Sequence, residues 1–128
     1  NGKNVIGRCY VCHKVGSVGV EFGPTLAGWG SGQDRETILK AIIEPSADLA
    51  HGYEGTELVV KGDKRLQGFI QAEGDPIVIR VFGGEDIAIA ASDVKSRKKM
   101  SSSLMAPASR LGLNAQQVRD IVEYIKVN

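Results

Sequence analysis

The sequence predicts a mainly α-helical domain with a small antiparallel β-sheet of about four strands inserted before its last helix. Two observations support this prediction. Apolar residues recur at helical spacing near both ends of the chain, whereas residues 55–92 consist of short β-branched runs separated by turn dipeptides. The 128 residues suffice for one domain with its own core, so we expect a single domain over 1–128, possible also as a fragment of a longer protein.

Three helical segments are expected outside the sheet. Residues 3–13 fit a short helix, and Asp34 is suited to cap a second helix over 35–44. Asn114 is suited to cap the last helix, with Gln117 three residues later forming an approximate capping box. The apolar residues that follow at helical spacing are Val118, Ile121, Val122 and Ile125, so one face of this helix should pack against the domain.

The middle of the chain is expected to form four antiparallel strands. The β-branched runs are residues 58–60, 66–72, 77–82 and 87–91. They are separated by Gly-Asp, Gly-Asp-Pro and Gly-Gly sequences, which suit hairpin turns. We expect irregular loops at the glycine-rich segment 16–32 and at the polar segment 101–110, and a solvated loop at the basic cluster Lys95–Lys99.

The composition argues against two classes of partner. Sixteen Lys and Arg face fifteen Asp and Glu, and the basic cluster is short and lacks interleaved aromatic residues, so we expect no nucleic-acid partner. No apolar run approaches the roughly 18 residues of a membrane span, so we expect none in this segment. With only three Phe, three Tyr and one Trp, the core could also accommodate a large apolar cofactor.

The residues with distinctive chemistry are Cys9-Tyr10-Val11-Cys12-His13. A C-x-x-C-H run is the attachment signature of c-type haem. Thiols at positions i and i+3 of one helical turn project to the same side, where each can form a thioether with a vinyl group of one porphyrin. His13 follows directly and is placed to bind the iron as the proximal ligand. The sequence therefore predicts one covalent haem c on Cys9 and Cys12.

Three other interpretations of the two cysteines are weaker. A redox disulfide would call for a βαβ context, which the pattern lacks. A zinc site would need a fourth ligand, and His51 is the only other strong nitrogen or sulfur donor in the chain. Two inert buried cysteines would not explain the adjacent histidine. Haem attachment is the interpretation that uses all three residues.

A second axial ligand is expected, because six-coordinate iron suits an electron carrier. The candidates are Met100, Met105 and His51. We favour Met105, which lies in an irregular segment before the last helix, where a loop can cover the second haem face. Met100 follows a basic run, and His51 lies in an expected turn and is more simply an exposed loop residue. A thioether ligand would raise the reduction potential relative to a second imidazole.

Further motifs resemble those of a known family. Besides C-x-x-C-H, these are Gly23-Pro24-Thr25-Leu26, Ile42-Ile43-Glu44-Pro45-Ser46, Leu104-Met105-Ala106-Pro107 and Tyr124-Ile125. Over nearly its whole length the chain resembles class I cytochromes c. More narrowly, it is similar to the haem-binding domains common in planctomycete-type bacteria, which are often found at the ends of multidomain dehydrogenase-like proteins.

The resemblance implies roles for individual residues. It implies that the Pro24 carbonyl accepts a hydrogen bond from the second ring nitrogen of His13, which fixes the tautomer and orientation of the imidazole. It also implies that Met105 is the distal ligand. Trp29 and Tyr53 are candidates to line the haem or reach a propionate, with ordinary packing as the alternative.

The expected function is single-electron transfer and not enzymatic catalysis, since the redox chemistry belongs to the haem. Covalent attachment takes place outside the bacterial cytoplasmic membrane, so we expect a periplasmic or otherwise extracytoplasmic location. Expected partners are redox proteins met through small contacts, or a fused dehydrogenase domain. Two alternatives are a five-coordinate haem enzyme or gas sensor in which Met105 does not bind iron, and a non-haem interaction domain that uses its strands.

Overall fold

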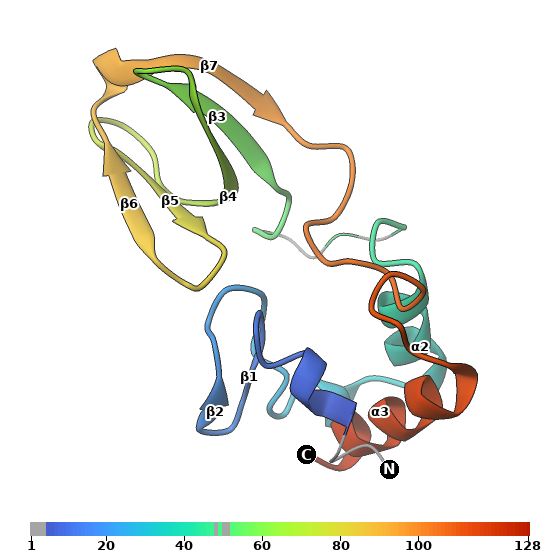
Figure 1. Ribbon diagram of the computed structural model, residues 1–128. Helices are drawn as coiled ribbons and strands as arrows, with labels where there is room; N and C mark the ends of the chain where they lie inside the picture. Colours follow the sequence, from blue (N-terminus) through green and yellow to red (C-terminus); the bar gives the residue numbers. More distant parts are fainter. Residues whose placement is uncertain (1–4, 48, 50–51) are drawn as a thin grey trace. The chain divides into compact units, whose positions relative to one another are not determined.

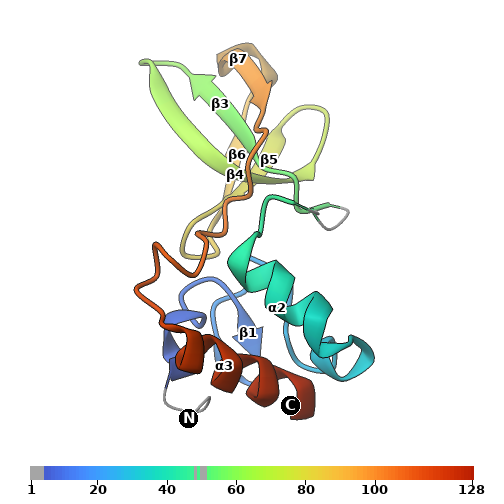
Figure 2. The same cartoon turned by 90° about the vertical axis from the view of Figure 1, so that its right-hand side faces the viewer.

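The chain forms two compact units, the helical unit Asn1–Asp48 with Met105–Asn128 and the sheet unit Leu49–Leu104 (Figures 1 and 2). The computed structural model describes residues 5–47, 49 and 52–128. The elements of the helical unit are η1 (Ile6–Arg8), β1 (Lys14–Val15), β2 (Val18–Gly19), η2 (Gly30–Gly32), α2 (Arg35–Ile43) and α3 (Ala115–Val127). Those of the sheet unit are β3 (Thr56–Val60), β4 (Lys64–Ala72), β5 (Ile77–Val81), β6 (Asp86–Ile89), η3 (Ala91–Asp93) and β7 (Val94–Lys99).

The two long helices begin at the capping residues that the sequence indicated. The Asp34 carboxylate accepts a hydrogen bond of 2.7 Å from the backbone N–H of Thr37 at the start of α2. Asn114 and Gln117 form a complete capping box at the start of α3. Both helices contribute to one apolar core, whose buried members are Ile6, Leu26, Ile38, Ile42, Ala108, Val118, Ile121, Val122 and Ile125.

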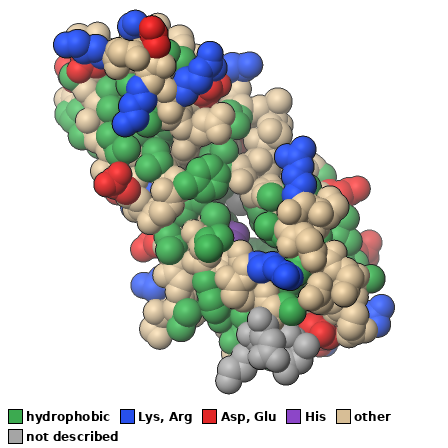
Figure 3. All heavy atoms as spheres, viewed as in Figure 1, with side chains coloured by type: hydrophobic (Ala, Val, Ile, Leu, Met, Phe, Trp, Pro, Cys, Tyr) green, Lys and Arg blue, Asp and Glu red, His purple; other side chains and the backbone are tan. Residues whose placement is uncertain are grey.

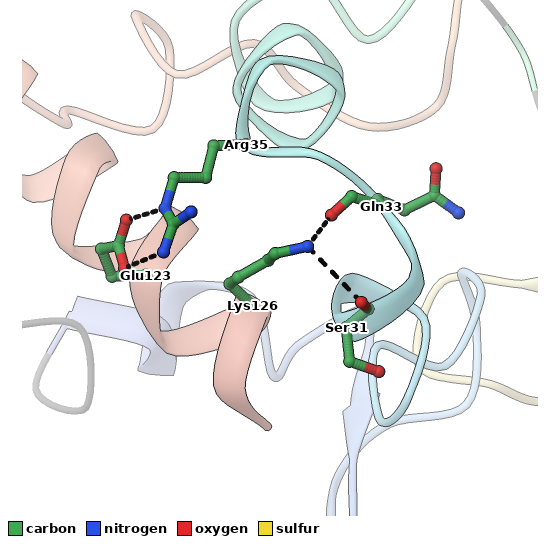
Figure 4. Close-up of polar contacts among 5 residues, drawn as sticks. All are labelled: Ser31, Gln33, Arg35, Glu123 and Lys126. Carbon is green, nitrogen blue, oxygen red and sulfur yellow. Dashed lines mark hydrogen bonds and ion pairs between the residues drawn. The ribbon is translucent and has the colours of Figure 1, made fainter.

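Polar contacts at the C-terminal end of α3 tie it to η2 and to the start of α2 (Figure 4). The Arg35 guanidinium pairs with the Glu123 carboxylate, which lowers the pKa of Glu123. The Lys126 ammonium donates to the backbone carbonyl groups of Ser31 and Gln33. These contacts fasten the end of the glycine-rich segment to the last helix.

The sheet unit is a five-stranded antiparallel sheet with strand order β6-β5-β4-β3-β7. Leu58 of β3 stands opposite Leu66 of β4 and Arg97 of β7. One face is apolar, with Leu58, Val60, Leu66, Ile77 and Ile79 buried in it. A Cβ atom at Gly68 would overlap the carbonyl oxygen of Arg80, so β4 and β5 approach each other closely there.

The prediction of a mainly α-helical fold is wrong, because the strands contain at least as many residues as the helices. The expected strands correspond to β3, β4, β5 and β6, but β7 adds a fifth in the basic cluster that we expected to be a loop. The basic side chains did not prevent strand formation because they remain near solvent and pair with carboxylates. These pairs are Lys95 with Asp63, Arg97 with Glu73 and Lys99 with Glu54.

Other expected boundaries also need correction. In the described part of segment 3–13, Val5 is helical, but a short 3-10 helix over Ile6–Arg8 and then turns follow it in place of a continued regular helix. The glycine-rich segment 16–32 contains strand β2, which forms a two-stranded hairpin with β1 just before the segment. The sheet unit extends beyond the expected insertion 55–92 at both ends. Within the described part of the chain, no helix combines the length and apolar character needed to cross a membrane.

Candidate functional site

The C-x-x-C-H residues form one helical turn that continues from η1. The Cys9 carbonyl accepts hydrogen bonds from the backbone N–H groups of Cys12, at 3.1 Å, and His13, at 2.8 Å. The Cys9 N–H in turn donates to the Ile6 carbonyl at 2.8 Å. This backbone geometry supplies the i, i+3 spacing of the thiols that attachment to a single porphyrin needs.

The following loop holds this turn through its carbonyl groups. Val20 N–H donates to the Tyr10 carbonyl at 2.8 Å, and Gly23 N–H donates to the Cys12 carbonyl at 2.6 Å. Carbonyl groups at the end of a helical turn have no partner within the turn, so the loop satisfies them. The loop backbone is therefore fixed against the motif, and residue 24 comes next to His13.

The imidazole of His13 is buried and held in one orientation. Its Nδ1 atom lies 2.7 Å from the Pro24 carbonyl oxygen, as the resemblance implied. Because a carbonyl only accepts, Nδ1 carries the proton, and Nε2 of the neutral ring keeps its lone pair. The structure gives Nε2 no hydrogen-bond partner among the described residues. Burial lowers the pKa of His13 and outweighs the opposing effect of the Pro24 bond.

Two glycines let the loop approach His13 this closely. A Cβ atom at Gly23 would lie 2.7 Å from Cε1 of the His13 ring and 3.1 Å from Nδ1. Gly19 has a φ of +104°, and a Cβ there would overlap the His13 carbonyl oxygen. The sequence analysis did not single out these two residues as part of the site. For Gly19 the only signal was the density of glycine in segment 16–32, whereas Gly23 begins the Gly23-Pro24-Thr25-Leu26 motif of the family resemblance.

Both cysteine side chains are free thiols, and both are partly buried. Burial raises the pKa of Cys9, and the neighbouring Cys12 raises it further. Burial also raises the pKa of Cys12. Redox-active C-x-x-C pairs and zinc sites both favour thiolates with a lowered pKa, so this environment is unlike either. Among the residues that the structure describes, no three His, Cys, Asp or Glu side chains gather as a metal site.

The three candidates for the distal ligand fall in different places. Met105 belongs to the helical unit, where it is partly buried against the same core as Cys9. Met100 belongs to the sheet unit, and its N–H donates to the Gly55 carbonyl at 2.8 Å. His51 lies outside the described residues. Of the two methionines, only Met105 belongs to the unit that contains His13.

The two aromatic residues considered for the site also belong to different units. Trp29 is partly buried against the helical core, immediately before η2. Tyr53 belongs to the sheet unit, where its ring makes an edge-on contact with Phe69 at a centroid distance of 5.1 Å. Burial raises the pKa of Tyr10, and the neighbouring Tyr124 side chain raises it further, a pairing that sequence reasoning did not find.

Comparison with known proteins gives no relative from which a function could be transferred, since neither the protein-family models nor the curated proteins contain a match. The functional assignment therefore depends on the chemistry of the residues around His13.

Proposed function

We propose that this chain is a monohaem c-type cytochrome, an electron carrier in which Cys9 and Cys12 bind the haem and His13 and Met105 bind its iron. The observation that carries the proposal is the buried His13 ring, which directs Nδ1 to the Pro24 carbonyl and leaves Nε2 with its lone pair. This ring directly follows two thiols on one helical turn. Two thiols and a neutral imidazole in this arrangement are suited to attach a haem covalently and to bind its iron.

The donor set fits a haem better than it fits a bare metal ion. The raised pKa of each thiol keeps it protonated near neutral pH, which leaves its sulfur able to add across a vinyl group but disfavours thiolate ligation. The lowered pKa of His13 keeps its ring neutral, the form that binds iron. When bound, the haem supplies a one-electron couple whose potential depends on the axial ligands.

The protein's own contribution is to orient the ligands and to support the attachment turn. The Pro24 carbonyl fixes the His13 ring and increases the electron density at Nε2. The loop bonds to the Tyr10 and Cys12 carbonyls keep the attachment turn rigid. Cys9 and Met105 pack against the helical core, so the site is supported from its apolar side.

The proposal extends to location and partners. Covalent attachment through C-x-x-C-H favours an extracytoplasmic site, with redox proteins or a fused dehydrogenase domain as partners. The net charge is +1, and both acidic and basic side chains are scattered among hydrophobic and other side chains on the visible face (Figure 3). Long-range electrostatic steering is therefore weak, and association with a partner should depend little on salt.

The visible spectrum of protein made in a host that matures c-type cytochromes tests this proposal. We expect a Met-to-iron charge-transfer band in the oxidised form and little carbon monoxide binding in the reduced form. Met105→Ala should remove the band, lower the potential and admit carbon monoxide, whereas the matched variant Met100→Ala should keep the band. A haem-loaded wild type that lacks the band and binds carbon monoxide readily would support a five-coordinate haem enzyme or sensor instead.

A further inference from the structure

The sheet unit contains a groove of about 350 Å³ at the end of the sheet where β3 begins between β4 and β7 (Figure 1). The described residues that line this groove all belong to the sheet unit. They include Glu54, Thr56, Ile70, Glu73, Arg97 and Lys99. The groove therefore contains no residue of the attachment turn around His13.

The lining of the groove includes a hydroxyl group without a hydrogen-bond partner. Thr56 is only 7% exposed, and its side chain makes no hydrogen bond within the described part of the chain. On β4 it stands opposite Gly68, which has no side chain to offer one. No fully buried side-chain oxygen of the described residues lacks a partner, so the Thr56 hydroxyl opens into the groove. Polar groups in buried side chains are normally hydrogen-bonded, so this hydroxyl is suited to bind a ligand.

Four charged side chains line the groove together with this hydroxyl. The Arg97 guanidinium donates two hydrogen bonds of 2.7 Å to the Glu73 carboxylate, so this pair is closed. The Lys99 ammonium lies 3.5 Å from the Glu54 carboxylate, too far for a strong hydrogen bond. Lys99 stands directly opposite Thr56 in the pairing of β7 with β3, so the two side chains share one face of the sheet. The loose pair and the free hydroxyl thus lie side by side.

We propose that this groove binds a free α-amino acid with an aliphatic side chain. The ligand carboxylate accepts hydrogen bonds from the Lys99 ammonium and the Thr56 hydroxyl. The ligand ammonium donates to the Glu54 carboxylate, and the aliphatic side chain lies against Ile70. A ligand with both charges replaces one loose ion pair by two charge-assisted hydrogen bonds, whereas a singly charged ligand leaves one member of the pair without a partner. This binding site goes beyond the proposed electron transfer and does not depend on it.

The size and charge of the groove favour this class of ligand over others. Small-molecule sites have volumes of about 300–1,000 Å³, so a groove of about 350 Å³ suits a ligand of few atoms. Its two cationic and two anionic side chains cancel in charge. A phosphate would meet the carboxylates of Glu54 and Glu73, and a polyamine would meet Arg97 and Lys99. A small zwitterion meets an opposite charge at each end.

The test titrates L-leucine into the full chain, purified from a host that matures c-type cytochromes, and measures the heat of binding. We expect saturable binding at one site with a Kd of about 1 mM or lower. Two matched compounds each lack one charge of leucine: isocaproate has no ammonium, and isopentylamine has no carboxylate. Each should bind at least about tenfold more weakly, because one hydrogen bond to a charged group is lost.

Variants locate the binding in this groove. Lys99→Gln removes the cation, and Thr56→Val removes the hydroxyl while it keeps the shape of the side chain. Each should weaken leucine binding about tenfold, whereas Thr56→Ser should bind as wild type does. Lys98→Gln is the matched control for Lys99→Gln, because Lys98 stands opposite Glu57 and points to the other face of the sheet. Its affinity for leucine should equal that of wild type.

Three results would overturn the inference. They are the absence of saturable binding up to about 10 mM leucine, equally tight binding of either singly charged compound, and equal weakening by Lys98→Gln and Lys99→Gln. None of them alters the cytochrome proposal, which the attached mass and the visible spectrum test separately. Colourless protein that still binds leucine with this pattern would refute the cytochrome proposal and support the groove.

Discussion

Nδ1 of His13 and the carbonyl oxygen of Pro24 lie 2.7 Å apart and join the C-x-x-C-H turn to the loop that follows it. This bond decides which ring nitrogen is available, since it places the proton on Nδ1. It also depends on residues that have no functional group of their own. Gly23 and Gly19 make the approach possible because neither carries a side chain.

Replacement of Gly23 by alanine tests the importance of this approach. The new Cβ would meet the His13 ring at Cε1 and push the imidazole away from Pro24. Loss of such a supporting contact typically weakens metal binding by about tenfold or more. Because protons compete with iron for Nε2, we expect the acid transition of the haem spectrum to move upward by about one pH unit.

Gly32→Ala is the matched control for this variant, since its added methyl group meets no atom within 4 Å. Its acid transition should coincide with that of wild type. An unchanged transition in the Gly23 variant would show that the loop does not position the proximal ligand.

The thiols of protein made without haem should react slowly with iodoacetamide at neutral pH. Burial raises the pKa of Cys9 and Cys12, so little thiolate is present. The alkylation rate should rise steeply only above about pH 8.5, the ordinary thiol pKa, and Cys9 should require the higher pH because it is the more buried. A rate profile that reaches a plateau below neutral pH would instead indicate a redox C-x-x-C pair.

The stability of the haem-free protein should depend on pH through His13. Its folded-state pKa is lowered by burial, so the unfolded chain binds a proton more readily than the folded chain. The stabilising contribution is therefore present above about pH 6.5, the ordinary histidine pKa, and is lost as the pH falls through the folded-state pKa.

Chemical unfolding of the haem-free protein between pH 4 and 8, compared with His13→Gln, measures this contribution. The wild type should lose more stability than the variant over the acidic part of that range, about pH 6.5 to 4. Parallel curves for the two proteins would mean that His13 is not buried as a neutral ring.

Two glycine variants should separate the roles of the two units. Gly30→Ala would force a Cβ into the Ile125 backbone, and Gly68→Ala would force one into the Arg80 carbonyl. Each should lower the free energy of unfolding of its own unit by about 3 kcal/mol, the upper end of ordinary substitutions. Gly30→Ala should reduce covalent haem loading, whereas Gly68→Ala should leave the amount of attached haem unchanged.

Intact mass, measured for both variants, reports the amount of attached haem. Equal loss of attached haem in both variants would contradict the assignment of the attachment site to the helical unit alone.

The elements that sequence predicted well are those set by local chemistry. α2 and α3 begin at Asp34 and Asn114 because each of these side chains accepts a backbone N–H of the first turn. By contrast, β7 is almost entirely polar and lacks the apolar alternation that marks a strand. Its pairing with β3 is decided by a long-range contact, so the balance between helix and sheet could not be judged from local patterns.

Part of the candidate site, like part of the fold, could be predicted from the sequence. The two thiols and His13 are adjacent in sequence, so their spacing was visible, and the Pro24 contact came from a family resemblance. The supporting role of Gly19 and Gly23 was not identifiable, because it depends on which atoms lie near them in the folded chain. The separation of Met100 and Met105 between two units likewise requires the three-dimensional structure.

The most direct test of the central claim is the intact mass of the denatured protein after production in a host that matures c-type cytochromes. We predict the polypeptide mass plus one haem, retained under denaturation because the bonds are covalent, and its loss in the double variant Cys9→Ala, Cys12→Ala. A wild-type mass equal to the polypeptide alone would contradict the account.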